Sequence, residues 1–400
     1  MEEIRYERVQ ETLYREEMEN GLTVYVLPKP GFSKTYATFS TKYGSVDNHF
    51  QVEGKMKVKV PDGIAHFLEH KMFEEPEGDI FSVFASHGAS ANAFTSFDRT
   101  VYLFSATDHI YENIETLVNF VQNPYFTDQN VEKEKGIIGQ EIKMYQDNPD
   151  WRVYFGLIAA MYQKHPVRID IAGTVESISE ISKETLYECY HTFYHPSNML
   201  LFIVGGVDPA KVMDLVRSNQ GKKTFSPQGE ISRFMPDEPE KVGNPHFTLK
   251  MPVSLPKIYF GFKEPAGYPE DEASIRHELV ARVLLDILLG PSSDLYQTLY
   301  DENLISDGFG YEYNQSPDYA FTIIGGDTPD PDKLLARFRE LVDPLIASGV
   351  NEANFERTRR KRIGSYLRML NSPEAIANEF TRYRFHGGDL LEVVKLYESL

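Results

Sequence analysis

Residues 130–149 read NVEKEKGIIGQEIKMYQDNP, and they align without a gap on residues 354–373, NFERTRRKRIGSYLRMLNSP. Identical or like-charged residues face each other at five positions of this alignment: Asn130/Asn354, Glu132/Glu356, Pro149/Pro373, Lys133/Arg357 and Lys135/Arg359. The segments that precede each copy also follow one order, strand-like and then helix-like. The repeat therefore predicts a chain built from two homologous domains.

Strand-like apolar runs alternate with amphipathic helical stretches along both halves of the chain. The clearest strands are expected at 23–29, 36–42, 102–105, 199–204, 257–262 and 319–324, and the clearest helices at 109–122, 130–146 and 271–289. This alternation predicts an α+β fold of two homologous α/β domains, in which helices flank each sheet. Asp62 is the expected N-cap of a further helix that begins at Gly63.

One stretch, residues 221–245, is rich in Pro, Gly and charge and has no apolar period. Such composition is typical of a linker. We therefore expect an N-terminal domain at 1–220 and a C-terminal homologous domain at 246–400. The sequence stops at KLYESL within a helical pattern, so we expect some C-terminal residues to be missing.

Composition excludes several classes of protein. The 400 residues are 41% hydrophobic and 25% charged, which is ordinary for a globular protein. The net charge of −19 repels nucleic acid and anionic lipid, so we expect neither partner. No apolar run approaches the roughly 18 to 20 residues of a membrane span. The acidic N-terminus is unlike a secretory signal, and the single cysteine, Cys189, fits a reducing compartment, so we expect a cytoplasmic protein.

The segment HFLEH, residues 66–70, carries the first candidate chemistry. At 100° per residue, His66, Glu69 and His70 fall within one arc of a helix. Two imidazoles one turn apart can hold one metal ion, and a carboxylate beside them can act on a water bound to that ion. The alternative is a helix with coincidental surface histidines, so a third ligand is needed.

The first copy of the repeat supplies candidates for that ligand. Glu134 and Glu141 fall on one stripe of the helix predicted at 130–146, and Thr358 and Ser365 replace them in the second copy. Buried carboxylates are costly unless a cation neutralises them, and a divalent metal ion would do so. An exposed acidic face on a very acidic protein is the alternative interpretation.

Together, HFLEH, the pair Glu134 and Glu141, SANAFTSFDRTVYLF and YHPSNMLLFIVGGVD resemble the pitrilysin/insulinase-type zinc peptidases, the inverzincins. The resemblance is closest to the short bacterial branch related to mitochondrial processing peptidase, whose two domains are the halves of a clamshell. It implies a zinc endopeptidase acting on unfolded peptides. It also implies one Zn²⁺ per chain, bound by His66, His70 and Glu141, with Glu69 as the general base and Glu134 as a second carboxylate that steadies the site.

The same resemblance implies how a substrate is held. Residues 90–95 match the edge strand that binds substrate backbone in the family, with Asn92 and Ala93 at the matching positions. Active members carry an Arg and a Tyr in the C-terminal domain, but Tyr300 and Asp307 stand at those positions here. We therefore expect a heterodimer in which a homologous subunit supplies the Arg/Tyr pair.

Two other functions stay open from the sequence. A catalytically inactive structural or assembly subunit of a processing-peptidase-like complex has the same fold, although such subunits usually lose motif residues that this chain keeps. A lyase of the HxxEH type that acts on a small thioether sugar would require an active-site cysteine. Cys189 lies far downstream of the motif, in a helical context, which disfavours the lyase.

Overall fold

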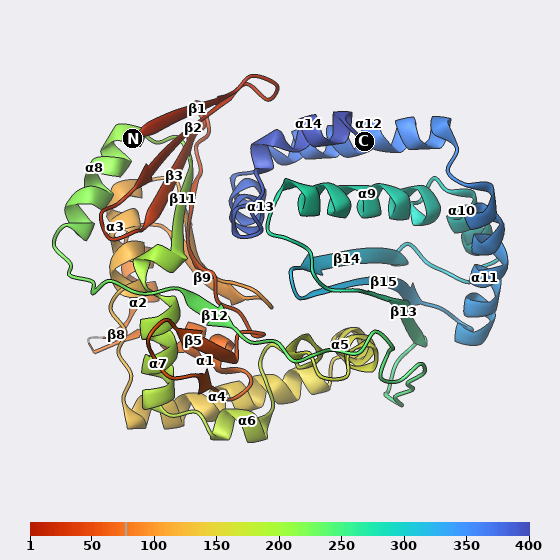
Figure 1. The fold of residues 1–400 in the computed structure, drawn as a ribbon, viewed down its shortest axis with the longest axis horizontal. Coiled ribbons are helices and arrows are strands. Elements are labelled where there is room, and N and C mark those ends of the chain that lie inside the picture. The colour runs from red at the N-terminus through yellow and green to blue at the C-terminus, as the bar shows by residue number, and fades with distance from the viewer. Residues whose placement is uncertain (77) are drawn as a thin grey trace. The chain divides into compact units, whose positions relative to one another are not determined.

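The computed structural model describes residues 1–76 and 78–400. The chain forms two compact units (Figure 1). Unit 1 contains residues 1–143, 169–235 and 369–385, and unit 2 contains residues 144–168, 236–368 and 386–400. The homologous domains predicted at 1–220 and 246–400 are defined by duplication in the sequence, whereas the two units are defined by compactness. The bounds of the homologous domains therefore remain a prediction.

Unit 1 is built on a sheet with the strand order β1-β2-β3-β11-β4-β10-β9. These strands are β1 (Glu2–Tyr6), β2 (Glu11–Glu17), β3 (Thr23–Pro28), β4 (Thr35–Thr41), β9 (Ser90–Thr95), β10 (Thr100–Ala106) and β11 (Met199–Gly205). Strands β3 and β11 run parallel, and the other neighbours are antiparallel. Every residue of β4 and β11 is buried, as expected for central strands covered on both faces, whereas β9 lies at the edge.

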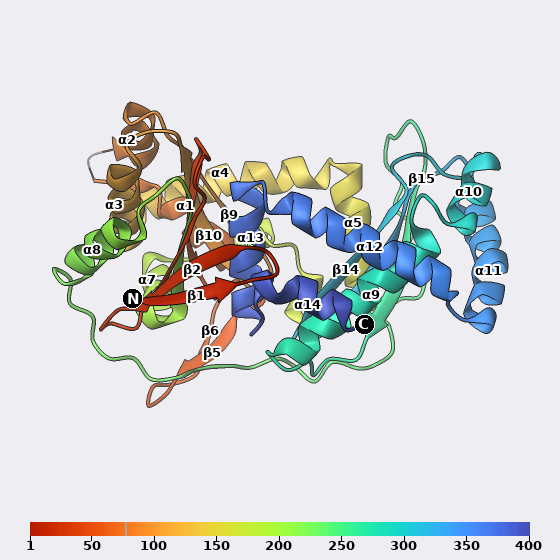
Figure 2. The same ribbon diagram turned by 90° about the horizontal axis from the view of Figure 1, so that it is seen from above.

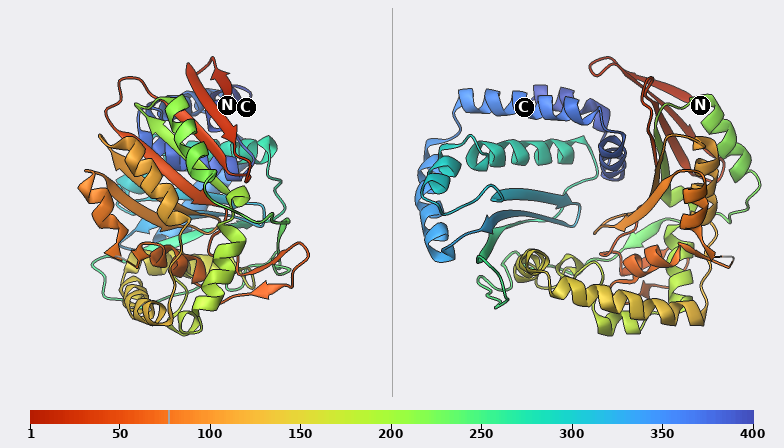
Figure 3. Two further views of the ribbon diagram at one scale, coloured as in Figure 1. Left: turned by 90° about the vertical axis from the view of Figure 1, so that its left-hand side faces the viewer. Right: turned by 180° about the vertical axis from the view of Figure 1, so that it is seen from behind.

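Helices cover both faces of this sheet (Figure 3). Helices α3 (Ile110–Val121) and α8 (Pro209–Gln220) pack on one face, and α13 (Pro373–Phe385) packs on β4 and β11 from the other. The fully buried ring of Phe380 on α13 stacks on Phe202, with 4.1 Å between ring centroids, and meets Tyr25 edge-on at 5.0 Å. A helix from the far end of the sequence therefore completes the core of unit 1.

The remaining elements of unit 1 surround this sheet. They are β5 (His49–Val52), β6 (Val58–Lys59), α1 (Ile64–Lys71), β7 (Glu74–Glu75), β8 (Gly78–Asp79), α2 (Ile80–Ser86), α4 (Asp128–Gln146), α6 (Val175–Ser179), α7 (Lys183–Phe193) and β12 (Ile231–Arg233). Helix α1 contacts β9, β10 and α7, which places it beside the free edge of the sheet.

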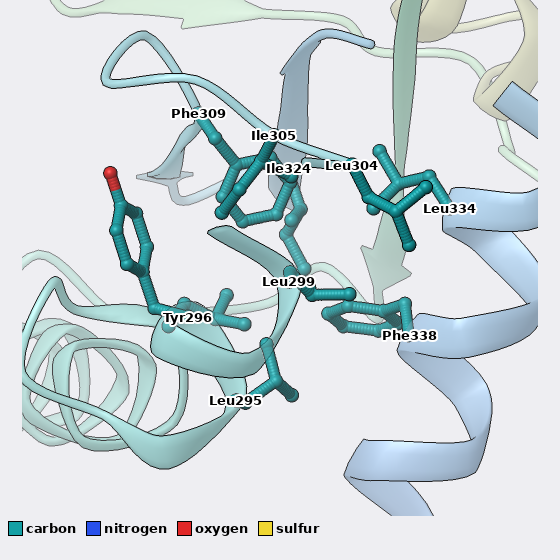
Figure 4. Packing of buried hydrophobic residues seen from close by; sticks show 10 residues of the cluster. Leu295, Tyr296, Leu299, Leu304, Ile305, Phe309, Ile324, Leu334 and Phe338 are labelled. Carbon is teal, nitrogen blue, oxygen red and sulfur yellow. The ribbon is translucent and has the colours of Figure 1, made fainter. Parts of the chain in front are cut away.

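Unit 2 has a smaller sheet with the order β13-β15-β14 (Figure 2). Its elements are α5 (Pro149–Met161), β13 (Lys257–Glu264), α9 (Glu272–Leu289), α10 (Asp294–Asp301), β14 (Gly310–Ser316), β15 (Tyr319–Asp327), α11 (Pro331–Ser348), α12 (Glu352–Met369) and α14 (Val393–Glu398). Helix α5 packs on β13. A cluster that includes Leu299, Ile324 and Phe338 joins α10 and α11 to the sheet (Figure 4).

The duplication is visible in the order of elements. Strands β4, β10 and β9 neighbour each other as β13, β15 and β14 do, and each set is followed by three helices, α3-α4-α5 or α11-α12-α13. The last helix of each set begins at the repeated proline, Pro149 or Pro373, and belongs to the other unit. The α+β fold with two homologous parts is confirmed, with one helix of each repeat exchanged.

One local prediction differs from the structure. Helix α1 begins at Ile64 with Gly63 as N-cap, and no side chain caps it. Asp62 instead accepts a hydrogen bond from Asn48 Nδ2 at 2.6 Å, so its N-cap role was wrong. Within the predicted linker, residues 221–245, strand β12 pairs with β5.

Among the residues that the structure describes, no helix combines the length and apolarity needed to cross a bilayer.

We predict that Phe380→Ala lowers the free energy of unfolding by about 3 to 5 kcal/mol, because it leaves a cavity between α13 and the sheet. Denaturant unfolding followed by circular dichroism measures this. Leu367→Ala, at a 43% exposed position on α12, should cost less than about 1 kcal/mol. Equal losses for both variants would contradict the packing described for α13.

Candidate metal centre

Helices α1 and α4 bring the predicted metal ligands together within unit 1. His66 Nε2 lies 3.7 Å from Glu141 Oε1, and His70 Nε2 lies 3.5 Å from Glu141 Oε2. One nitrogen or oxygen from each residue falls within 4.8 Å of the others. Residues far apart in sequence thus form one group with the spacing of a metal site.

The donor set and its spacing fit a zinc ion. Tetrahedral ligands at about 2.1 Å from zinc lie roughly 3.4 Å from one another, close to the two separations above. Two histidines and one glutamate are also a known set for catalytic zinc, in which three protein ligands leave the fourth position open. His66, His70 and Glu141 could therefore hold zinc with little movement.

Burial prepares His66 for this role. Its side chain is nearly enclosed, and burial together with the neighbouring His70 lowers the pKa of His66 to about 3. The imidazole is therefore neutral at physiological pH, as a metal ligand must be. In the part of the chain that the structure describes, His66 Nδ1 is buried without a hydrogen-bond partner.

His70, in contrast, contacts a carboxylate through the ring nitrogen that faces away from Glu141. Its Nδ1 lies 3.1 Å from Glu134 Oε1, so that the Nδ1–H can donate to Glu134 while Nε2 faces Glu141. Burial alone lowers the pKa of His70, but the hydrogen bond with Glu134 and the charges of Glu69 and Glu141 outweigh it and raise that pKa. A carboxylate in this position fixes the tautomer and orientation of a ligand imidazole.

Glu69 lies on the same helix and is only 7% exposed. Burial raises the pKa of its carboxyl group, and a hydrogen bond donated by Thr95 Oγ1 to Oε2, 2.7 Å long, opposes that rise. A carboxylate with a raised pKa is a stronger base than a solvated one. Thr95 ends strand β9, so it links Glu69 to the edge of the sheet.

The edge strand carries the predicted substrate-binding residues. Asn92 and Ala93 lie opposite Leu103 and Tyr102 of β10, and no strand pairs with the other side of β9 among the described residues. The Ala93 N–H donates to the Asn92 side chain at 2.9 Å, so it points away from β10. An added strand could pair along this edge, where it would compete with the Asn92 side chain for the Ala93 N–H.

In unit 2, the stretch that departs from the family pattern covers the last turn of α10 and the connection to β14. Tyr300 lies in that last turn with 44% of its surface exposed, and Asp307 follows in the connection. Two other tyrosines nearby are engaged within the unit: Tyr311 Oη accepts from Arg362, and Tyr313 Oη donates to Glu264.

The sequence did not predict the structural roles of three residues around the site: Gly63, Lys71 and Thr95. Gly63 has φ +86°, and a Cβ there would lie 2.5 Å from the carbonyl oxygen of Ala172, so glycine alone fits where α1 begins. The side chain of Lys71 is fully buried directly after His70. Thr95 stood within the quoted SANAFT segment, but its contact with Glu69 is non-local.

Sequence comparison identifies the chain. Residues 59–175 match the model of the insulinase peptidases, family M16, and residues 180–362 match the model described as the peptidase M16 inactive domain. The uncharacterized zinc protease YmfH of Bacillus subtilis is 54% identical over 400 residues, covering 99% of this chain and 93% of YmfH. This chain belongs to the M16 family. It is a short, two-domain bacterial member, and the family predicted from the motifs is confirmed.

Other relatives agree with this assignment. The zinc protease PqqE of Helicobacter pylori is 22% identical, over 92% of this chain and 82% of PqqE. The crystal structure of a putative M16-like peptidase from Alicyclobacillus acidocaldarius superposes with a TM-score of 0.95 at 43% identity, over 98% of this chain and 92% of that one. The two-domain M16 fold is therefore that of a solved relative.

We predict that Gly63→Ala lowers the free energy of unfolding by more than about 1 to 2 kcal/mol, because alanine is strained at this φ and clashes with the 172–173 backbone. Thermal unfolding measures the change. Gly136→Ala on α4, where the added methyl meets nothing within 4 Å, should be neutral or stabilising by up to about 1 kcal/mol. A Gly63→Ala protein as stable as the wild type would refute the constraint.

Proposed function

We propose that the protein is a zinc-dependent endopeptidase that hydrolyses unfolded peptides, with Glu69 as general base. The observation that carries this proposal is the convergence of His66, His70 and Glu141 beside Glu69, next to the open edge of β9. The names of the zinc-protease relatives agree with it.

His66, His70 and Glu141 are the proposed ligands of one Zn²⁺ ion per chain, and Glu134 orients His70. Zinc, when bound, supplies a Lewis acid that activates water and polarises a peptide carbonyl. The three side chains leave a coordination position open, as catalysis requires.

Glu69 is the proposed group that accepts a proton from the attacking water and returns it to the leaving amine. The raised pKa of its buried carboxyl group suits both steps, because a base must hold the proton and then release it. Thr95 Oγ1 donates a hydrogen bond to one oxygen of the Glu69 carboxylate. This bond fixes the orientation of the carboxylate, so its second oxygen keeps one direction during the proposed reaction.

Asn92 and Ala93 are the proposed binding residues for substrate backbone. A peptide that adds to β9 must be extended, so folded proteins are excluded and unfolded peptides are favoured. The edge strand ends at Thr95, whose hydroxyl binds Glu69, and this continuity leads an added strand towards the proposed base. The net charge of −19 favours basic peptides.

A homologous partner belongs to this proposal. Tyr300 and Asp307 stand where active members carry the Arg and Tyr, and an arginine that stabilises the developing oxyanion is worth several kcal/mol. We infer that this chain is the zinc-bearing subunit of a cytoplasmic heterodimer, in which the partner supplies that pair.

The same two positions favour a second candidate, an inactive structural subunit of such a complex. The two functions differ in metal content, because a structural subunit should purify without stoichiometric zinc. Peptide cleavage by the complex, lost when this chain's zinc ligands are changed, would exclude the structural role.

We predict that Glu69→Gln keeps one zinc per chain but lowers peptide cleavage by at least ~10²-fold, because the amide cannot take up the proton. Metal analysis by plasma spectrometry and a fluorogenic peptide assay with the partner measure the two effects. Glu132→Gln, at an exposed position of α4, should change neither. Cleavage that survives in Glu69→Gln would show that the base is misassigned.

We predict that Glu141→Gln abolishes stoichiometric zinc binding, because a neutral amide replaces the anionic ligand. In the wild type, added zinc should raise the melting temperature, since a ligand that binds only the folded state stabilises it. That rise should vanish in Glu141→Gln and persist in Glu132→Gln. An equal zinc-dependent shift in all three proteins would contradict the ligand set.

A further inference from the structure

Lys71 directly follows His70, yet its side chain is fully buried. Removing an ammonium group from water is costly unless anions compensate it. Two carboxylates do so here. Lys71 forms an ion pair with Glu74, and its Nζ lies 3.9 Å from Glu134 Oε2.

The Glu134 carboxylate therefore lies between the His70 imidazole and the Lys71 ammonium. Its Oε1 lies 3.1 Å from His70 Nδ1, and its Oε2 faces the Lys71 ammonium. The Glu134 residue is only 7% exposed, so water has little access to its carboxylate. His70 therefore contacts one oxygen within hydrogen-bond distance, and the Lys71 ammonium attracts the other across 3.9 Å.

We propose that Lys71 is a positioning residue that fixes the Glu134 carboxylate against His70, so that His70 Nε2 stays aimed at the metal position. This inference rests on the proposed zinc site. Without the ammonium, the Glu134 carboxylate loses the charge that faces its Oε2 and is held less firmly against His70. The imidazole then loses its fixed orientation, and metal affinity falls.

Lys71 also balances charge at this site. Glu69, Glu134 and Glu141 surround the two imidazoles, and Glu74 lies in β7, three residues after Lys71. The ammonium faces Glu134 Oε2, whereas Glu134 Oε1 faces His70 Nδ1, and the proposed metal ligand of His70 is the other ring nitrogen, Nε2. It can therefore neutralise Glu134 without occupying the metal position.

The test is the zinc affinity of Lys71→Met, measured with zinc alone by competition with a chromophoric chelator. We expect affinity ~10 to 100-fold weaker than in the wild type, the usual loss when a partner of a metal-binding histidine is disturbed. Lys135→Met removes the same charge from α4, where Lys135 binds Glu132 and the Ser179 carbonyl, and should stay within about 2-fold.

A double-mutant cycle separates positioning through Glu134 from other roles. In a Glu134→Gln background, Lys71→Met should weaken zinc binding by less than about 3-fold, because the carboxylate it positions is gone. A full, additive loss in that background would overturn the proposal. So would wild-type affinity in a folded Lys71→Met protein whose only defect is stability.

Lys71→Gln covers the case in which Lys71→Met does not fold, since the amide can still donate to Glu74 while it lacks the charge. The same loss of zinc affinity is expected for it, and wild-type affinity would refute the positioning role. If the wild-type chain itself binds no zinc, the proposed function fails together with this inference. A zinc-binding wild type with unaffected Lys71 variants overturns the inference alone.

Discussion

Unit 1 gathers three carboxylates around two imidazoles, an arrangement that needs hydrogen bonds or positive charge to compensate for burial. Glu69 and Glu134 are nearly buried, and Glu141 turns towards the same two imidazoles. Ionised carboxylates away from water are strongly unfavourable unless they are paired or bind a metal. The contacts of Thr95 and Lys71 each stabilise one of these groups, and the arrangement of α1 against α4 keeps the third in reach.

The second copy of the repeat also has a buried carboxylate, and a side-chain cation compensates its charge. Side chains link α12 to α9 as they link α4 to α1, but Ser365 replaces Glu141, and Arg362 stands at the position of Ile138. Arg362 Nε lies 3.0 Å from the buried carboxylate of Asp286 on α9. A side-chain cation therefore joins the two helices of unit 2.

Much of this could be predicted from the sequence, because it is local or periodic. Helical spacing placed His66, Glu69 and His70 on one face, and the repeat predicted the duplicated order of elements. The failures have a common cause. The start of α1 is set by the close approach of residues 172–173 to Gly63, and the burial of Lys71 is set by Glu134 on another helix. Neither contact leaves a pattern in neighbouring residues.

The exchange of helices between the repeats constrains how the chain can fold as it is synthesised. All strands of the unit 1 sheet have left the ribosome once residue 205 is free, but Phe380, which covers Phe202 and Tyr25, comes near the C-terminus. Helix α5 likewise packs on β13, a strand that is synthesised about a hundred residues later. Domains usually fold one after another, N-terminal first, during translation. In this protein the first sheet must stay open on one face until almost the entire polypeptide has been made, so a nascent chain presents an apolar surface that a chaperone would recognise.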